Sequence, residues 1–382
     1  MDIFDMDDFK KLVTGKQNGP CVSIYMPSDR TNAEKNRIRF KNLFGEAEKM
    51  MAAMGIGDVD MAEGLKPARR LLEDQTFWQH QSDGLALFLS DERFETYRLP
   101  VAFEEAAVVT DRFYIKPLVP FITSDARFFV LAVSQSFVRL FQCTRQEIQE
   151  VEPEEMPKGL AETLKYDDPE KQLQFHTGTG GTGGKRPAVF HGQGVGADDA
   201  KDRILRYFRE IDKWLCVAMR REGGPLILAG VDYLFPIYRE ANSYPHLLEQ
   251  DILGNPDEMK EKELHDKAWD LMEPHIKKVQ DDAVGRYQDL VGTGKTSKDL
   301  KEIVAAAVYG QVAVLFVARG IQQWGRFDPE SDRVDIHQTQ RPGDEDLLDL
   351  AALETLLKGG EVYVIKRQKV PEDAPAAALF RY

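Results

Sequence analysis

The stretch that decides the fold begins with Gly178-Thr179-Gly180-Gly181-Thr182-Gly183-Gly184, continues through His191-Gly192-Gln193-Gly194-Val195-Gly196, and leads into residues 198–220. Glycine loses more backbone freedom on ordering than any other residue, so this run cannot pack a core cheaply. We therefore expect residues 176–197 to form an exposed loop that is ordered by something outside the protein. Because Lys185 and Arg186 follow the glycine run, we expect the ordering partner to carry phosphates.

Residues 198–220 have the pattern of an amphipathic helix that follows this loop directly. Apolar residues such as Ile204, Phe208 and Leu215 recur at three- and four-residue spacing and predict one buried side. At 100° per residue the opposite side is basic, and it consists of Arg203, Arg206, Arg209, Lys213 and Arg220. Two interpretations of this basic side stay open: contact with the backbone of RNA, and a solvated surface with helical ion pairs.

Apolar runs and helical periodicity on either side of this stretch predict an α/β protein. We expect strands at 22–26, 85–89, 95–98 and 107–110 with helices at 33–54 and 67–76, then a hairpin of 128–133 and 137–141 and a strand at 226–230, then helices at 261–291, 297–309 and 345–357 with strands at 312–317, 361–365 and 378–381. The middle group is ordered strand, helix, strand, which favours a partly parallel sheet.

A chain of 382 residues is long enough for two or three domains, each with its own core. We predict three: an N-terminal α/β domain of residues 1–118, a central domain of residues 119–272 that carries the loop 176–197, and a C-terminal three-layer α/β/α domain of residues 273–382.

Composition narrows the class of function. The formal net charge of −14 opposes close approach to phosphates over the whole surface, so any contact with nucleic acid must be local and basic. Cys21, Cys143 and Cys216 are far apart, which favours a reducing cytoplasm and indicates neither a zinc site nor a disulfide framework. The histidines are scattered, so we predict no metal and no cofactor. The most apolar stretch, residues 305–318, is too short to span a bilayer, and we predict a cytoplasmic protein without export.

Several short motifs occur in an order that resembles a known family. They are Cys21-Val22-Ser23-Ile24-Tyr25-Met26-Pro27 followed by Arg37-Ile38-Arg39-Phe40-Lys41-Asn42-Leu43, then Gly84-Leu85-Ala86-Leu87-Phe88, His191-Gly192-Gln193-Gly194, Leu226-Ile227-Leu228-Ala229-Gly230 and Gly285-Arg286-Tyr287. With this order the chain resembles the archaeo-eukaryotic class 1 peptide-chain release factors and their paralogue Pelota. It is most similar to their bacterial relatives, the bacterial archaeo-eukaryotic release factor family, and within it to family 3.

The resemblance implies an N-terminal domain that enters the ribosomal decoding region, a central RNase H-like domain, and a C-terminal domain similar to ribosomal proteins that bind kinked RNA. It implies the ribosome and tRNA as partners, with a translational GTPase as a candidate third. In the family a Gly-Gly-Gln loop helps water to attack the ester that links the peptide to tRNA. A slim glycine backbone can enter a crowded cavity, and a neutral amide can orient water there.

This sequence departs from the family motif in the loop. If His191 and Gly192 are matched to the His-Gly that precedes the motif, its glycines and glutamine fall on Gly194, Val195 and Gly196. The catalytic amide is then missing, and Gln193 lies three positions early. The stop-codon motif Asn-Ile-Lys-Ser also has no match near residues 32–35, so the resemblance does not extend to the decoding of stop codons.

The leading hypothesis is a ribosome-associated, release-factor-like protein that acts in translation termination, ribosome rescue or quality control. Gln193 and His191 are the candidate catalytic residues of the loop. The candidate RNA contacts are Lys185, Arg186, Gly192, Gly194, Arg203, Arg206 and Lys213. Two alternatives stay open: a binding factor like Pelota that performs no chemistry, which the missing Gly-Gly-Gln favours, and an RNase H-like nuclease, which needs several carboxylates around a metal ion.

Overall fold

The computed structural model describes residues 2, 4, 6–14, 19–55, 64–123, 127–134, 137–145, 147–151, 195–220 and 223–382, with the side chains of 195–200 excepted. The chain divides into two compact units, Met1–Asp125 with Lys277–Tyr382, and Ala126–Ile276. The first unit holds most of the predicted N- and C-terminal domains and the second most of the predicted central domain. The three predicted domains and their boundaries remain predictions.

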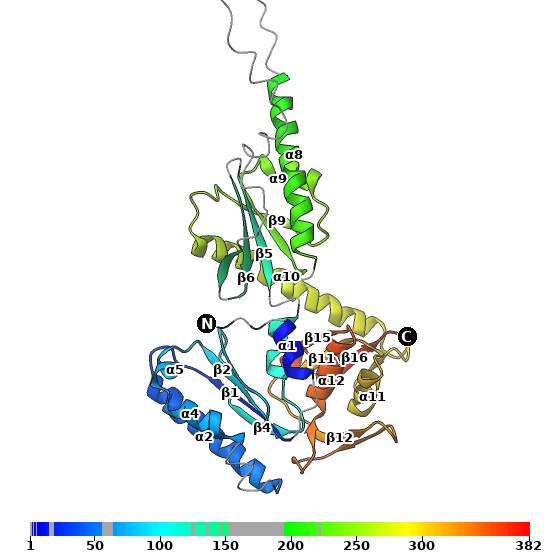
Figure 1. Ribbon diagram of the computed structural model, residues 1–382. Coiled ribbons are helices and arrows are strands. Elements are labelled where there is room, and N and C mark those ends of the chain that lie inside the picture. The colour runs from blue at the N-terminus through cyan, green and yellow to red at the C-terminus, as the bar shows by residue number, and fades with distance from the viewer. Residues whose placement is uncertain are drawn as a thin grey trace, which may run out of the picture. The chain divides into compact units, whose positions relative to one another are not determined.

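An antiparallel sheet in the order β3-β2-β1-β4 forms the N-terminal part of the first unit (Figure 1). Its strands are β1 (Cys21–Pro27), β2 (Gly84–Leu89), β3 (Phe94–Leu99) and β4 (Ala106–Thr110). The strands predicted at 95–98 and 107–110 are β3 and β4, the two edge strands of this sheet. The helices α2 (Ala33–Ala53), α4 (Lys66–Glu73) and α5 (Gln75–Gln79) pack on one face, and α1 (Met6–Val13) packs on the other. The single helix predicted at 67–76 is wrong, because Asp74 ends α4 and caps α5 by accepting a hydrogen bond from Phe77 N.

A second sheet, in the order β10-β16-β11-β15, forms the C-terminal part of the same unit. Its strands are β10 (Thr296–Ser297), β11 (Val312–Ala318), β15 (Glu361–Ile365) and β16 (Ala376–Phe380). Because side chains alternate along a strand, Leu315 and Val317 face α11 (Leu300–Val308) and α12 (Leu347–Leu357), whereas Val314 and Phe316 face the end of α10 (Glu261–Asp289). Helices therefore cover both faces of this sheet.

Three strands between β11 and α12 had no counterpart in the sequence-based expectation. They are β12 (Trp324–Asp328), β13 (Arg333–Ile336) and β14 (Glu345–Asp346), paired in the order β13-β12-β14. The helices also begin later than expected: α11 starts after Asp299, and α12 starts after Asp346. Each aspartate accepts a hydrogen bond from a backbone N–H of the first turn, which is the usual role of an N-cap.

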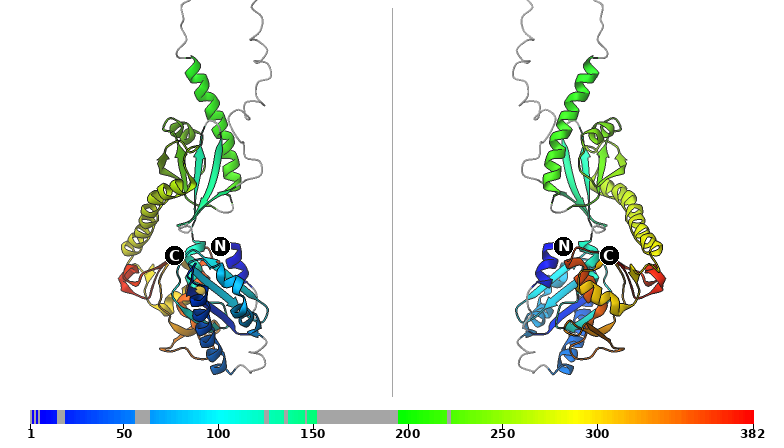
Figure 2. Two further views of the ribbon diagram at one scale, coloured as in Figure 1. Left: turned by 90° about the vertical axis from the view of Figure 1, so that its left-hand side faces the viewer. Right: turned by 90° about the vertical axis from the view of Figure 1, so that its right-hand side faces the viewer.

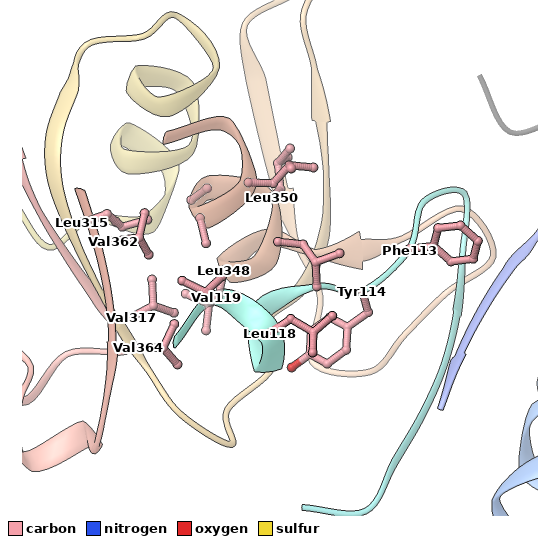
Figure 3. Packing of buried hydrophobic residues seen from close by; sticks show 14 of the residues in the cluster. Phe113, Tyr114, Leu118, Val119, Leu315, Val317, Leu348, Leu350, Val362 and Val364 are labelled. Atoms are coloured by element: carbon pink, nitrogen blue, oxygen red, sulfur yellow. The ribbon is translucent and has the colours of Figure 1, made fainter. Parts of the chain in front are cut away.

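One hydrophobic core joins the two sheets of the first unit. The segment after β4 contributes the short helices η1 (Lys116–Leu118) and α6 (Val119–Ile122), which pack on α12 and on the C-terminal sheet. Figure 3 shows Leu118 and Val119 among Leu348, Val317 and Val364. The shared core explains why two sheets that are far apart in sequence form one compact unit.

A buried ion pair lies inside this shared core. Lys116 Nζ is 2.7 Å from Asp346 Oδ2 and 2.5 Å from the carbonyl oxygen of Ile321. The side chains of Lys116 and Asp346 are only 2% and 1% exposed. Asp349 lies beside them and accepts hydrogen bonds from the backbone N–H groups of Ile115 (2.9 Å) and Lys116 (2.5 Å). The charged groups of this cluster are thus removed from water, and each depends on the others to compensate its charge.

This cluster predicts a pH dependence of stability. Burial, together with the neighbouring Asp346 carboxylate, raises the pKa of Asp349 to about 7. An unfolded aspartate has a pKa of about 3.9. Between these two values the folded state binds more protons, so the free energy of unfolding should fall as the pH rises from about 4 to about 7. An Asn at position 349 can still accept both backbone hydrogen bonds but cannot ionise.

We therefore expect Asp349→Asn to be at least as stable as the wild type at pH 8 and to lose the part of the pH dependence that Asp349 causes. Urea denaturation of both proteins at several pH values between about 5 and 8 measures this. Parallel stability curves for the two proteins across that range would contradict the assignment.

The second unit is built on a five-stranded sheet in the order β7-β6-β5-β8-β9. Its strands are β5 (Phe128–Val133), β6 (Val138–Cys143), β7 (Ile148–Val151), β8 (Leu226–Gly230) and β9 (Leu247–Leu253). β5, β8 and β9 are parallel, as the strand-helix-strand order indicated, and β6 is antiparallel to β5 and β7. The helices α8 (Val195–Ala218) and α9 (Leu234–Ala241) cover one face, and the first part of α10 covers the other.

Candidate functional site

The function that we predicted from the sequence depends on the helix α8. Its backbone is helical from Val195, three residues before the predicted start, so Asp198 and Asp199 lie within the helix. In Figure 1 α8 runs along the sheet of the second unit and its first turns extend past the strands; Figure 2 shows the same from two other sides. The predicted loop therefore joins a helix end that projects beyond its own sheet.

The inner side of α8 holds the helix firmly on the sheet. Phe208 and Ile211 are fully buried, and Phe208 makes an edge-to-face contact with Tyr238 of α9 at 5.3 Å between ring centroids. The buried residues of this side, which match the predicted apolar side, are Ile204, Leu205, Tyr207, Phe208, Ile211, Leu215 and Met219. Seven buried side chains over four turns make α8 a rigid support for whatever lies on its outer side.

One polar contact fixes the position of α8 relative to the loop between α9 and β9. Asp212 is 5% exposed and accepts hydrogen bonds from the backbone N (2.9 Å) and Oγ (2.5 Å) of Ser243. The Cys216 thiol, one turn further along, is 3.4 Å from the same hydroxyl. Asp212 falls within the apolar side of the helix, and its partner lies 31 residues away, so the sequence pattern gave no signal for this contact.

The outer side of α8 is exposed and positively charged. From Lys201 to Arg220 the exposed charged side chains comprise six cations and two carboxylates. The cations are Lys201, Arg203, Arg206, Arg209, Lys213 and Arg220, and the carboxylates are Asp202 and Glu210. Within a chain of net charge −14, this helix side is a local concentration of positive charge.

At most half of these six cations are paired with carboxylates of the described residues. Lys213 Nζ lies 2.7 Å from Glu210 Oε1 and Lys201 Nζ lies 3.3 Å from Glu240 Oε2, and all four side chains are about half exposed or more. Arg206, Arg209 and Arg220 make no ion pair or hydrogen bond with any part of the chain that the structure describes. The helical pair of Asp202 with Arg206, expected for an inert solvated surface, does not form.

Three of the predicted RNA contacts, Arg203, Arg206 and Lys213, thus lie on one exposed face of a rigid helix. The other predicted site residues lie outside the described residues: Lys185, Arg186, His191, Gly192, Gln193 and Gly194. Lys201 is also exposed, but at 100° per residue it lies on the side of Met219, where it pairs with Glu240 of α9, and so it is not part of the basic face. From Arg206 to Ala218, where α8 ends, the face is about 18 Å long at 1.5 Å per residue, and Arg220 lies in the turn that follows.

This geometry suits the binding of a phosphate backbone along the helix. Arg206, Arg209 and Arg220 are exposed and have no partner among the residues that the structure describes, so their guanidinium groups can make charge-assisted hydrogen bonds to phosphate oxygens. In contrast, the described residues contain no group of three His, Cys, Asp or Glu side chains placed to hold a metal ion. His265, one of the scattered histidines, is mostly buried, and its Nε2 lies 2.8 Å from the carbonyl oxygen of Thr144, which is a structural contact.

One protein family is similar to the central part of the chain. Residues 128–274 match the model of bacterial archaeo-eukaryotic release factor family 7. This part of the chain is therefore similar to a bacterial release factor-like family, in agreement with the resemblance seen in the sequence. Family 3, which the resemblance favoured, is not confirmed, because the matching model is that of family 7. The match supports the leading hypothesis of a release-factor-like role.

Solved structures of release factors and their relatives are also similar. The archaeal translation termination factor aRF1 has 12% identity over 99% of this chain and 96% of its own, with a TM-score of 0.25. Archaeal Pelota, bound to the ribosome with ABCE1, has 14% identity over 76% of this chain and 72% of its own, with a TM-score of 0.41. Dom34 of S. cerevisiae has 10% identity over 77% of this chain and 74% of its own, with a TM-score of 0.35. These scores are too low to transfer residues or domain positions.

No curated protein matches the chain. Within the described ranges, no helix has both the length and the apolar character that crossing a bilayer requires.

Proposed function

We propose that this protein is a cytoplasmic, ribosome-associated factor of termination, rescue or quality control whose α8 lies against RNA. The observation that carries the proposal is the exposed basic face of α8 on an otherwise acidic chain, in which Arg206, Arg209 and Arg220 have no carboxylate partner among the described residues. Such a face binds phosphates locally while the net charge keeps the rest of the molecule away from RNA. The family match over the same unit supports the ribosome as the RNA-containing partner.

The loop that precedes α8 is proposed to reach the acceptor end of tRNA. Lys185, Arg186, Gly192 and Gly194 would contact RNA there, and Gln193, with His191 beside it, would orient the attacking water in peptidyl-tRNA hydrolysis. A neutral amide is suited to that task because it can donate to and accept from water without adding charge. A translational GTPase is the proposed additional partner, on the strength of the sequence resemblance.

Peptide release from stalled ribosome complexes tests the catalytic part of this proposal. We expect the wild-type protein to release peptide and Gln193→Ala to reduce the release rate by about 100-fold or more, since a positioned catalytic group contributes on the order of 10² to 10⁴. Gln174→Ala, which removes another glutamine 19 positions earlier in the sequence, is the matched control and should keep full activity.

The other outcomes distinguish the alternatives. Full activity in Gln193→Ala would exclude Gln193 from the mechanism. If the wild type sediments with ribosomes but releases no peptide, the protein acts as a binding factor like Pelota, the second candidate that the missing Gly-Gly-Gln favours. A wild-type protein that does not sediment with ribosomes at any salt concentration would overturn the proposal as a whole.

A further inference from the structure

A second group of exposed cations lies in the other unit, at the carboxyl ends of two parallel strands. β11 and β15 run side by side in register, with Ala318 opposite Ile365. The backbone N of Arg319 donates a hydrogen bond of 2.7 Å to the carbonyl oxygen of Ile365. Arg319 and the residues that follow β15 therefore meet at one edge of the sheet. In open α/β sheets this is the edge at which ligands bind most often.

The residues after β15 are Lys366-Arg367-Gln368-Lys369, and all four are exposed. They form a tight turn, in which Lys369 N donates to Lys366 O at 2.8 Å and Val370 N donates to Arg367 O at 2.9 Å. Val370 is 2% exposed and packs into the core below. The turn is thus anchored at its base and presents three cations to solvent.

These cations are poorly neutralised. Arg367 Nε lies 3.7 Å from Asp373 Oδ1, in a pair whose side chains are 51% and 70% exposed. Such an exposed pair holds its partners weakly. Arg319, Lys366 and Lys369 have no carboxylate within 4.0 Å in the part of the chain that the structure describes. Another carboxylate near this edge is that of Glu104, beside Gly320.

The loop that closes this edge is strained. Glu372 and Asp373 are consecutive non-glycine residues with φ of 60° and 52°, a region that side chains with a Cβ rarely adopt. The strained conformation is held by contacts to Glu372: Tyr287 OH donates to it at 2.8 Å, and Lys298 Nζ lies 2.5 Å from it. Backbone strain that the surrounding structure maintains occurs preferentially at functional sites.

We propose that Arg319, Lys366, Arg367 and Lys369, here called the β15 edge, form a second contact for the phosphate backbone of RNA. The inference rests on the proposed function, because the RNA in question is that of the ribosome. Long, exposed and largely unpaired cations spread over a turn fit a polymer with regularly spaced phosphates. A single small anion would need converging, buried donors instead.

The test compares two triple variants that remove the same charge. Lys366→Gln/Arg367→Gln/Lys369→Gln removes three cations of the β15 edge. Lys260→Gln/Lys262→Gln/Lys301→Gln removes three exposed lysines that have no ion pair among the described residues. Sedimentation with purified ribosomes and binding to protein-free ribosomal RNA are measured for both and for the wild type. Since all six positions are exposed, thermal unfolding should be nearly unchanged and serves as the folding control.

We expect the β15-edge variant to bind ribosomes and protein-free RNA about tenfold or more weakly than the wild type. We also expect its negative slope of log K against log [salt] to be shallower by about 2 to 3, because each lost phosphate contact contributes about 0.7 to 0.9. The control variant should change affinity by less than about twofold. Wild-type affinity and slope in the β15-edge variant would overturn the inference while leaving the function assigned to α8 intact. Weaker binding to ribosomes with unchanged binding to protein-free RNA would also overturn it, because the partner would then be a protein.

The two proposals fail in different ways. If wild-type protein does not bind ribosomes, the proposed function fails, and the protein-free RNA measurement alone then decides whether the β15 edge binds RNA.

Discussion

Replacing Lys116 with Met should lower the free energy of unfolding by about 3 to 5 kcal/mol, the largest single-residue effect on stability that we expect in this protein. The ammonium group of Lys116 is the partner of Asp346, and both side chains are almost completely buried. Methionine fills a similar volume but leaves the Asp346 carboxylate charged, desolvated and without its counter-ion. Urea denaturation at neutral pH measures the loss.

A double variant separates the lost charge from the lost packing. In Lys116→Met/Asp346→Asn no uncompensated charge remains, and Asn can still accept the hydrogen bonds that Asp346 Oδ1 takes from Gln323 N and Leu348 N. We expect this variant to recover more than half of the loss. Lys213→Met, which breaks an exposed pair with Glu210, is the control and should cost less than about 0.5 kcal/mol. A loss below about 1 kcal/mol for Lys116→Met would show that the pair does not hold the shared core together.

Elements with a strong pattern could be predicted from the sequence, and elements with a mixed pattern could not. β5, β8 and β11 are continuous apolar runs because the sheet buries them on both faces, and α2 and α8 have clear helical periodicity. β9 was missed because Glu249, Gln250 and Asp251 occupy the middle of an edge strand. β12 and β13 were missed because short strands with many charged residues give little signal of period two.

Contacts between distant parts of the chain also could not be predicted from a single sequence. Lys116 and Asp346 are 230 positions apart, and nothing local marks either as a buried residue. The two-unit division follows from that shared core. The basic side of α8 was predictable because it depends only on helical spacing, but whether carboxylates neutralise it depends on tertiary neighbours such as Glu240.

The second large effect concerns that basic side. Arg206→Gln/Arg209→Gln/Arg220→Gln should weaken binding to ribosomes on the order of 100-fold at low salt, because three phosphate contacts are lost together. The substitutions leave the buried side of α8 untouched, so stability should change little.

A matched control removes three arginines whose charge is already compensated. Arg37, Arg69 and Arg333 lie within 3 Å of Glu34, Glu48 and Asp335, respectively. The triple variant Arg37→Gln/Arg69→Gln/Arg333→Gln has the same change in net charge as the α8 variant. We expect it to bind ribosomes within about threefold of the wild type, because the local potential and not the total charge governs a phosphate contact.

The salt dependence of ribosome binding tests the central claim most directly. Sedimentation of the wild type and the α8 variant is measured between about 50 and 200 mM salt, a range in which phosphate contacts weaken steeply. We predict a steep negative slope of log K against log [salt] for the wild type and a slope smaller by about 2 to 3 for the α8 variant. Equal slopes and equal affinities for the two proteins would contradict the claim that α8 binds RNA.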